Sequence, residues 1–419
     1  MSRKVQLRLI YSDRMGEAGE NHVIRFPRRA RENFRFSNDR VVIGKGLYEL
    51  SLQVKQAYRE DVSRLTRMIK SGKVREEETY YVGFVTRSVQ QRVSRKKDPK
   101  GPWVTEGISS ITVGADPEFG LIGKQGFLVR GNQVLSAAGK FGSDGPSVEV
   151  RPDPSRSHLE VVANMQSILQ NPPPRVDQFL WKGGATFVDP NRVYWFGGHI
   201  HLGRPSQIPA NRALPIYTQI AGALDGLLAL PMARFDTPEP WHRRNGCKYN
   251  YGKAGDIRAD YPERDRFEYR VLSGLWLVHP TLAKIAIGTA KCIAETAYGR
   301  IADKKFDLEW ASNPISKPGM LKTFGIKGFR EIRAMINRAR PEEVTEDKID
   351  VWERWVRSLD RFDDYKPEIT ALISLAKEDP SHIVEGVSLD VRKNWQEDKK
   401  ILPRASKQLR TALEEVEAR

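Results

Sequence analysis

The sequence predicts an α+β protein in three regions, with a sheet packed on helices in the middle one. Between about residues 108 and 300, short segments rich in Val, Phe, Tyr and Trp alternate with Gly and Pro turns, a pattern typical of strands. Beyond residue 300 the apolar spacing is helical. We therefore expect a basic N-terminal α+β accessory region over 1–103, a catalytic core over 104–300 and a helical C-terminal accessory region over 301–419.

The individual elements follow from the period of the apolar residues. In the basic region, residues 50–70 have helical spacing, and the proline-broken run 94–103 indicates a linker. Strand-like alternation covers residues 3–12, 21–26 and 80–85, helices are expected near 156–170, 210–230 and 279–298, and an apolar helical stripe comprises Val351, Trp352, Trp355 and Val356.

Composition excludes several classes of protein. The 419 residues are 39% hydrophobic and include nine Trp, which is too apolar for a disordered polyelectrolyte. No stretch reaches the roughly 18 uninterrupted apolar residues of a membrane span, and the first residues lack the apolar core of a signal peptide. Cys247 and Cys292 are the two cysteines, too few for a disulfide framework. We expect a cytoplasmic protein without a membrane partner.

The net charge of +16 is concentrated at one end of the chain. Residues 1–100 carry 24 Lys+Arg and 12 Asp+Glu, residues 101–300 carry 22 and 18, and residues 301–419 carry 23 and 23. Such an excess can hold an acidic protein, a nucleic acid or a virion surface by counterion release. A solvated face that only keeps the protein in solution remains the alternative.

Four pairs of residues in the core carry the chemistry. Residues two apart on a strand point to the same face, and the residues between these partners are mostly apolar. We therefore expect a sheet with one face packed on helices and the other lined with acids, imidazoles and guanidiniums. The pairs are Asp116 with Glu118, Glu149 with Arg151, His199 with His201 and Glu268 with Arg270.

This set of side chains indicates a metal site that handles phosphate. Several carboxylates with an imidazole suit Mg²⁺ or Mn²⁺, whereas the arginines suit phosphate oxygens. Together they favour binding of a nucleoside triphosphate and stabilisation of a transferred phosphoryl group. The sequence contains no G-x-x-x-x-G-K-[ST], G-x-G-x-x-G, H-E-x-x-H or G-x-S-x-G motif, which argues against the classes that those motifs mark.

A segment rich in Gly, Asn, Tyr and cations, RRNGCKYNYGKAGDIR at 243–258, separates the last two pairs. It predicts a substrate loop that closes over the site, with an ordinary basic surface loop as the alternative. Cys247 within it has no partner that marks a nucleophile. The residues expected to face substrate or phosphate are Arg243, Arg244, Tyr251, Lys253, Asp256 and Arg258.

In this order, the motifs GADPEF, DGPSVEVRP, GGHIHLG, YGKAGDIR and RFEYRVLSGLW resemble the phage-type COOH-NH2 ligase family (amidoligase type 2). That family belongs to the glutamine synthetase and glutamate-cysteine ligase superfamily, and the resemblance covers about residues 110–290. It implies a curved, mainly antiparallel, glutamine-synthetase-like sheet with helices on its outer face. It also implies ATP-dependent amide formation through an acyl phosphate, on a peptide or protein substrate with an amine donor.

The resemblance also implies roles for individual residues. Glu118 and Glu149 would hold one Mg²⁺, and Asp116, His199 and Glu268 a second. His201 would touch the nucleotide phosphates, together with Arg151, Lys253 and Arg258. Arg270 would stabilise the transferred phosphoryl group, and Asp144 would bind metal or orient the amine.

Two departures from the family pattern bear on these roles. Asp116 stands where larger members often have Glu, and only Glu160 is available as a further metal carboxylate after the second strand. Two other functions stay open: a nucleic-acid-binding or virion-associated protein that keeps the fold without the chemistry, and a metal-dependent phosphohydrolase or nuclease.

Overall fold

The computed structural model describes residues 35–37, 40–43, 50–53, 103–190, 192–234, 251–259, 265–302, 329–338, 343–378, 389–396 and 406–419. The chain forms two compact units, Met1–Asp98 and Pro99–Arg419, which we describe separately.

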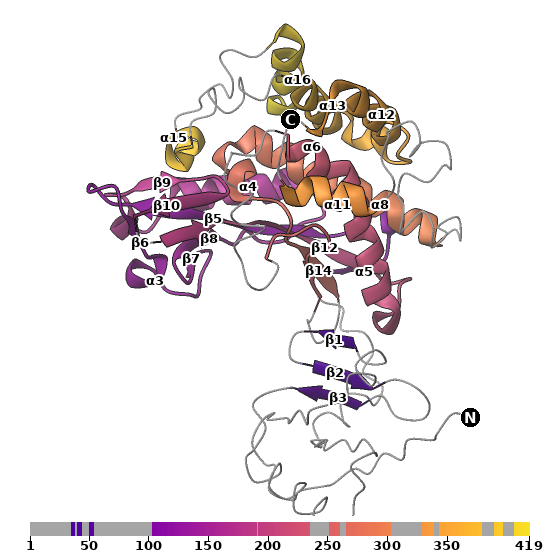
Figure 1. Ribbon diagram of the computed structural model, residues 1–419, viewed down its shortest axis with the longest axis horizontal. Helices are drawn as coiled ribbons and strands as arrows, with labels where there is room; N and C mark the ends of the chain where they lie inside the picture. Colours follow the sequence, from indigo (N-terminus) through magenta and orange to yellow (C-terminus); the bar gives the residue numbers. More distant parts are fainter. Residues whose placement is uncertain are drawn as a thin grey trace, which may run out of the picture. The chain divides into compact units, whose positions relative to one another are not determined.

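The first unit contains a three-stranded antiparallel sheet (Figure 1) of β1 (Arg35–Ser37), β2 (Arg40–Ile43) and β3 (Leu50–Gln53). The helix expected over residues 50–70 is wrong for its first four residues, which form strand β3. Leu-Ser-Leu-Gln alternates with a period of two and pairs along β2, so local strand pairing outweighs the helical spacing read over a longer window. The other elements expected before residue 94 lie outside the described residues.

A mixed sheet, mainly antiparallel, is the centre of the second unit (Figure 1), which confirms the α+β class. Its parallel pair joins β12 to β4, and a separate hairpin contains β10 (Thr186–Asp189) and β11 (Arg192–Trp195). The main strands follow one another as β13 (Ile257–Arg258), β14 (Arg266–Tyr269), β12 (Gly198–Pro205), β5 (Val113–Ile122), β8 (Ser147–Val150) and β7 (Phe141–Asp144), while β4 (Val104–Thr105) pairs with β12, and β6 (Leu128–Val129) and β9 (Leu180–Lys182) pair with β5.

Except for the four-residue helix at 131–134, which lies beside β7, helices cover one face of this sheet (Figure 1). The three helices predicted in the core are present, and further helices lie beyond residue 300, as the spacing predicted. In chain order they are α3 (Gly131–Val134), α4 (His158–Gln170), α5 (Ala210–Leu224), the π-helix η4 (Asp225–Ala229), α6 (Leu230–Met232), α8 (Pro280–Ala302), α11 (Phe329–Arg338), α12 (Glu346–Val356), α13 (Lys366–Lys377), α15 (Val391–Gln396) and α16 (Lys407–Glu417), with short 3₁₀ turns η2 (Ile108–Ser110), η3 (Pro174–Val176), η5 (Gly274–Val278) and η7 (Phe362–Tyr365).

The apolar residues between the charged ones pack under these helices. Val148, Ile200 and Phe267 are all fully buried in one continuous core with the helical side chains. This burial confirms the predicted alternation, and hydrophobic contact on one face leaves the other face of the sheet for polar side chains.

The helical stripe beyond residue 300 also belongs to this core. Trp352 and Trp355 are buried, and the Trp352 indole Nε1–H donates to the carbonyl oxygen of Leu227, 3.2 Å away. This contact attaches α12 to the end of the α5–η4–α6 segment. That segment, Ala210–Met232, has the length and mean hydropathy (1.3) of a membrane span, but 72% of the apolar window is buried inside the protein, as in a core helix.

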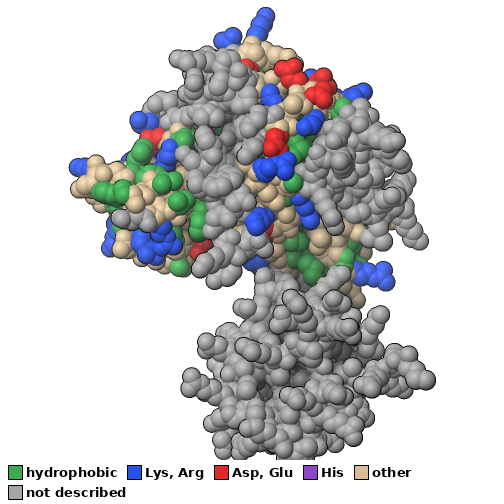
Figure 2. All heavy atoms as spheres, viewed as in Figure 1, with side chains coloured by type: hydrophobic (Ala, Val, Ile, Leu, Met, Phe, Trp, Pro, Cys, Tyr) green, Lys and Arg blue, Asp and Glu red, His purple; other side chains and the backbone are tan. Residues whose placement is uncertain are grey.

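On the face shown in Figure 2, acidic and basic side chains are interspersed over the second unit. Apolar side chains gather at the end of the sheet formed by β6, β9 and β10. Phe127, Leu180 and Val188 are the large hydrophobic residues exposed among the described part of the chain.

Glycine at position 198 is required for β12 to approach η5. A Cβ there would lie 2.1 Å from the Ser273 carbonyl oxygen and 2.2 Å from Trp276 Nε1. We expect Gly198→Ala to lower the free energy of unfolding by about 1–3 kcal/mol, since neither neighbour can move freely. Gly299→Ala is the control, because a Cβ on this α8 residue would meet nothing within 4 Å and Ala favours a helix by roughly 0.5–1 kcal/mol. Urea unfolding compares the two, and equal midpoints would contradict the packing argument.

Candidate active site

Antiparallel pairing brings the four predicted residue pairs onto neighbouring strands. His201 lies opposite Glu268 in the β12–β14 register, and His199 lies opposite Asp116 in the β12–β5 register. Glu118 lies opposite Glu149 in the β5–β8 register. Arg151 and Arg270 lie one residue beyond the ends of β8 and β14. Side chains separated by more than 150 positions in the chain thus meet on one surface.

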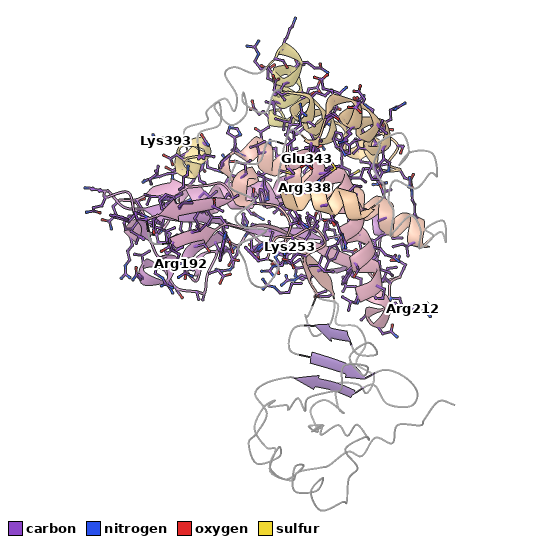
Figure 3. All side chains as sticks on the ribbon, viewed as in Figure 1. Arg192, Arg212, Lys253, Arg338, Glu343 and Lys393 are labelled. Atoms are coloured by element: carbon purple, nitrogen blue, oxygen red, sulfur yellow. The ribbon has the colours of Figure 1, made fainter. Side chains whose placement is uncertain are left out.

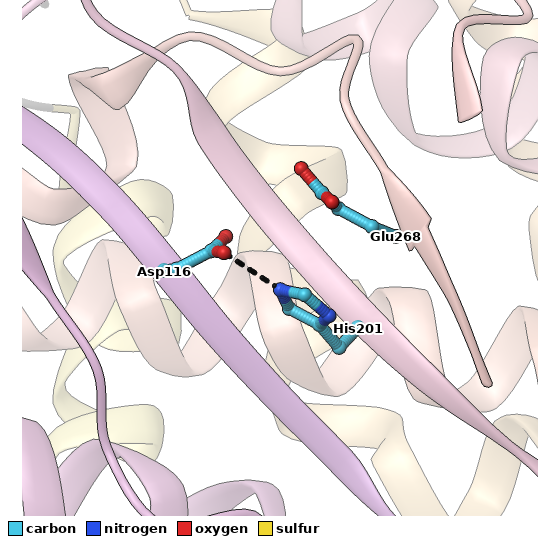
Figure 4. Close-up of side chains that lie close together, drawn as sticks. All are labelled: Asp116, His201 and Glu268. Atoms are coloured by element: carbon cyan, nitrogen blue, oxygen red, sulfur yellow. Dashed lines mark ion pairs between the residues drawn. The ribbon is translucent and has the colours of Figure 1, made fainter. Parts of the chain in front are cut away.

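Asp116 lies between the two imidazoles. Its Oδ2 is 2.9 Å from His201 Nε2, and its Oδ1 is 3.3 Å from His199 Nδ1. Figure 4 shows the Asp116–His201 ion pair with the Glu268 carboxylate nearby. Glu268, fully buried, lies 3.2 Å from the same His199 Nδ1. A ring nitrogen with two carboxylates beside it favours a cation at this point.

Arginines neutralise the buried acids. Arg270 Nε lies 3.2 Å from Glu268 Oε1, and Arg258 Nε lies 3.0 Å from Glu268 Oε2. Arg151 forms an ion pair with Glu149. The structure therefore places these three predicted phosphate-binding cations directly against predicted metal ligands.

Tyr251 joins two of the acid and imidazole groups. Its hydroxyl donates to Glu118 Oε2 at 3.1 Å and is hydrogen-bonded to His199 Nε2 at 2.8 Å. Because the hydroxyl proton points to Glu118, His199 Nε2 must donate, and in the neutral ring Nδ1 then carries the lone pair. Arg270 stacks over the Tyr251 ring, 4.7 Å from its centroid. Tyr251, expected in the substrate loop, thus orients His199.

The described part of the predicted loop, residues 251–259, lies along the end of β14. Arg258 faces Glu268 in the β13–β14 register, and the Asp256 carbonyl accepts from the Arg270 amide at 3.1 Å. Lys253 is half-buried (Figure 3). Arg243, Arg244 and Cys247 lie outside the described residues.

Three groups of side chains have ligand atoms close enough to share a cation, each within 4.8 Å of one another: Asp116, His201 and Glu268; Asp116, Glu149 and His199; and Glu118, Asp144 and Glu149. The geometry thus adds His201 to the predicted ligands and groups Asp144, which was predicted to bind metal or orient the amine, with Glu118 and Glu149. Glu160 joins none of these groups in the described part of the chain; it is exposed and bonded to Ser155.

The donor set fits a divalent cation. It consists of carboxylate oxygens and imidazole nitrogens, which suit Mg²⁺ or Mn²⁺. Asp116 Oδ1 and His199 Nδ1 are buried, and neither makes a hydrogen bond of good geometry. Buried polar atoms in this state need a partner, and a cation between them would supply one.

The charges of the site shift its proton equilibria. Burial alone would raise the pKa of Asp116, but the His201 and His199 imidazoles outweigh it and hold that pKa well below its usual range. Burial would lower the pKa of His199, but Asp116, Glu118 and Glu268 raise it above its ordinary value. Burial and the Asp116 carboxylate raise the pKa of Glu149 to about 8, against the effect of Arg151. Glu149 and His199 therefore favour their protonated forms, which reduces the negative charge of the site.

Sequence patterns missed three contributors. Gly197 donates its amide to Glu118 Oε2 at 2.7 Å, Trp103 lies 5.8 Å from the His201 ring between centroids, and Asp225 is buried beneath β14, where its Oδ1 accepts from the Tyr269 hydroxyl at 2.8 Å. The sequence does contain a signal for Asp225, because this residue is the one acid in the apolar run AGALDGLLAL. Trp103 had none, since it falls in the expected linker.

The mainly antiparallel sheet thus presents acids, imidazoles and guanidiniums together on one face. Residues 113–317 match the family model described as "Phage phiEco32-like COOH.NH2 ligase-type 2". The match confirms the resemblance that the motifs carry and supports a carboxylate-amine ligase.

Comparison with curated proteins and with solved structures gives no further identification. No curated protein matches the chain. One solved structure, "Crystal structure of a bifunctional glutathione synthetase from Pasteurella multocida", is similar with 10% identity and a TM-score of 0.29. The alignment covers 64% of this chain and 56% of that protein, and a likeness of this size carries no argument.

The raised pKa of Glu149 makes cation binding depend on pH. Glu149 titrates near pH 8 rather than near 4.5, so Mg²⁺ bound to its carboxylate must release a proton at pH 7. We expect Mg²⁺ affinity to rise from pH 6 to pH 8 by up to about tenfold per pH unit and then to level off.

Calorimetry in buffers of different ionisation enthalpy measures the released proton. Glu149→Gln should bind Mg²⁺ more weakly and lose this slope. Asp153→Asn changes an exposed acid paired with Lys140 and should keep it. An identical slope in Glu149→Gln and the parent would exclude Glu149 as the source.

Proposed function

We propose that the second unit is an ATP- and Mg²⁺-dependent ligase that joins a substrate carboxylate to an amine through an acyl phosphate. The observation that carries this proposal is the convergence of Asp116, His199 and Glu268 with Arg270 inside a carboxylate-amine ligase domain. A carboxylate oxygen would attack the γ-phosphorus of ATP and release ADP. The amine nitrogen would then attack the acyl carbon, release phosphate and lose its proton.

The residues divide into groups with separate tasks. The three ligand groups would hold Mg²⁺, which when bound screens phosphate charge. Arg270 and Arg258 would turn from Glu268 towards the phosphoryl oxygens, and His201, Arg151 and Lys253 would bind other phosphate oxygens. Asp144, exposed at the end of β7, would orient the amine or hold metal. Glu268 would keep Arg270 and His199 in position.

Fold, partners and location complete the proposal. The sheet would have the curvature of glutamine synthetase, and the substrate would be a peptide or protein. The excess charge of residues 1–100 would bring the enzyme to an acidic protein, a nucleic acid or a virion in the host cytoplasm. Residues 1–103, 104–300 and 301–419 would be accessory, catalytic and accessory regions, respectively.

ATP turnover tests the reaction. With Mg²⁺, we expect ADP and phosphate to form mainly when a carboxylate and an amine are supplied together as peptide and amino-acid pools. Glu268→Gln should lower turnover by about 10–100-fold, because it removes a charged metal ligand and the partner that orients Arg270 and His199. Glu160→Ala should retain parental turnover, because Glu160 joins none of the ligand groups described above.

Mass spectrometry of the reaction identifies the species that gains an amide. ATP hydrolysis that ignores the amine would instead indicate a phosphohydrolase. Absence of turnover in both parent and Glu268→Gln, with equal DNA binding, would indicate a binding protein.

Closure of the loop over the site gives an independent prediction. An acyl phosphate must be shielded from water, so ATP with Mg²⁺ should slow tryptic cleavage within residues 236–258 at Arg243, Arg244, Lys253 and Arg258. Peptide mapping over time measures the rate at each bond, and cleavage after Lys407 at the start of α16 serves as the internal reference. Equal loop cleavage with and without the nucleotide would count against closure.

A further inference from the structure

A buried carboxylate lies beneath the active-site strand and the loop. Asp225, the first residue of the π-helix η4, is fully buried. Its Oδ1 accepts from the Gly255 amide at 3.1 Å and from the Tyr269 hydroxyl at 2.8 Å. Tyr269 lies between Glu268 and Arg270 on β14. One side chain therefore joins the loop segment to the strand that carries two site residues.

Helix α11, which also buries Ile332 and Ile336 in the core, reaches the same point. Arg333 Nε lies 3.3 Å from Asp225 Oδ2, and Asn337 Oδ1 accepts from the Ala254 amide at 2.9 Å. These two α11 residues are four positions apart, so they share one face of the helix. Residues 113–317 match the ligase family, so α11 lies beyond the matched segment.

Gly255 shows how closely the helix approaches the loop. Its φ of +81° is in the region that favours glycine, and a Cβ there would lie 2.6 Å from an Arg333 guanidinium nitrogen. The guanidinium thus lies against the loop backbone, between the helix and Asp225.

The same turn leads directly into the site. The Asp256 amide donates to the Lys253 carbonyl at 2.9 Å, and Asp256 Oδ2 accepts from the Gly252 amide at 2.9 Å. On one side of this turn Tyr251 bonds His199 and Glu118, and on the other Arg258 pairs with Glu268. Movement of the turn would displace both contacts.

We propose that Asp225, Arg333 and Asn337 form a clamp that positions residues 251–258 over the strand ends, which makes α11 part of the catalytic unit. The clamp rests on the proposed function for its effect on turnover. Its three members are positioning residues, since they act through Tyr251, Asp256 and Arg258. Substrate phosphate would meet a loop whose cations are already in place.

Burial and charge agree with this assignment. Burial raises the pKa of Asp225 to about 6, although Arg333 and the Tyr269 hydroxyl oppose the shift. The carboxylate is thus charged at neutral pH, where it needs its cation. Substitution of Asp225 itself risks misfolding, whereas the Arg333 side chain is about one-third exposed and can be changed more safely.

Hydrogen exchange in the full-length protein tests the clamp without requiring turnover. We expect Arg333→Ala and Asn337→Ala to speed exchange of the Ala254 and Gly255 amides at least tenfold while Phe119 on β5 exchanges at the parental rate. Arg333→Lys should restore part of the protection. Arg338→Ala is the matched control, because Arg338 is on the same helix but pairs with Glu343 at 2.8 Å (Figure 3).

Steady-state kinetics then tests the positioning role. In an active parent, both alanine variants should raise KM for ATP about tenfold or lower kcat by a similar factor, measured at a temperature where circular dichroism shows each variant to be folded. Exchange at the parental rate in both variants would overturn the clamp. Faster exchange with unchanged kcat and KM would overturn its role in positioning. An inactive parent with faster exchange in the variants would overturn the proposed reaction and leave the clamp supported.

Discussion

The pairing of β12 with β5 and β14 is the constraint on which the site depends. It sets His199 opposite Asp116 and His201 opposite Glu268. A slip of one residue would turn every one of these side chains to the helix-covered face and bring Ile200 into the site. The buried apolar residues between them oppose that slip, so the hydrophobic core on one face also determines the chemistry on the other.

Because the carboxylates of the site are buried, their negative charge has to be balanced by neighbouring groups. Glu268 is fully buried and Glu149 almost so, and each carboxylate has a guanidinium beside it. Glu149 also keeps a proton up to about pH 8. Protons and arginines balance the acids here, and under the proposed function a cation and a phosphate would replace them. The ion pairs of the site therefore join its predicted functional residues to one another.

A helix beyond the segment that matches the family model contacts the loop of the candidate site. Tyr251 orients His199 from a loop, and that loop is attached to α11 through Ala254 and Gly255. The helical region beyond residue 300 was expected to be accessory. Its first described helix, α11, contacts the segment that carries Arg258 and Asp256, and under the clamp proposal this helix would also serve catalysis.

The sequence by itself determined the α+β class, the core helices and the residues of the four pairs, because periods of two and 3.6 are local properties of the chain. Local pattern failed at Leu50–Gln53, where a short strand was hidden in a longer helical spacing. Tertiary packing sets which strands are neighbours, that His201 joins a ligand group, and that Asp225 meets Arg333, 108 positions away. The reason is physical: strand register and helix docking depend on packing between distant segments, which no local pattern contains.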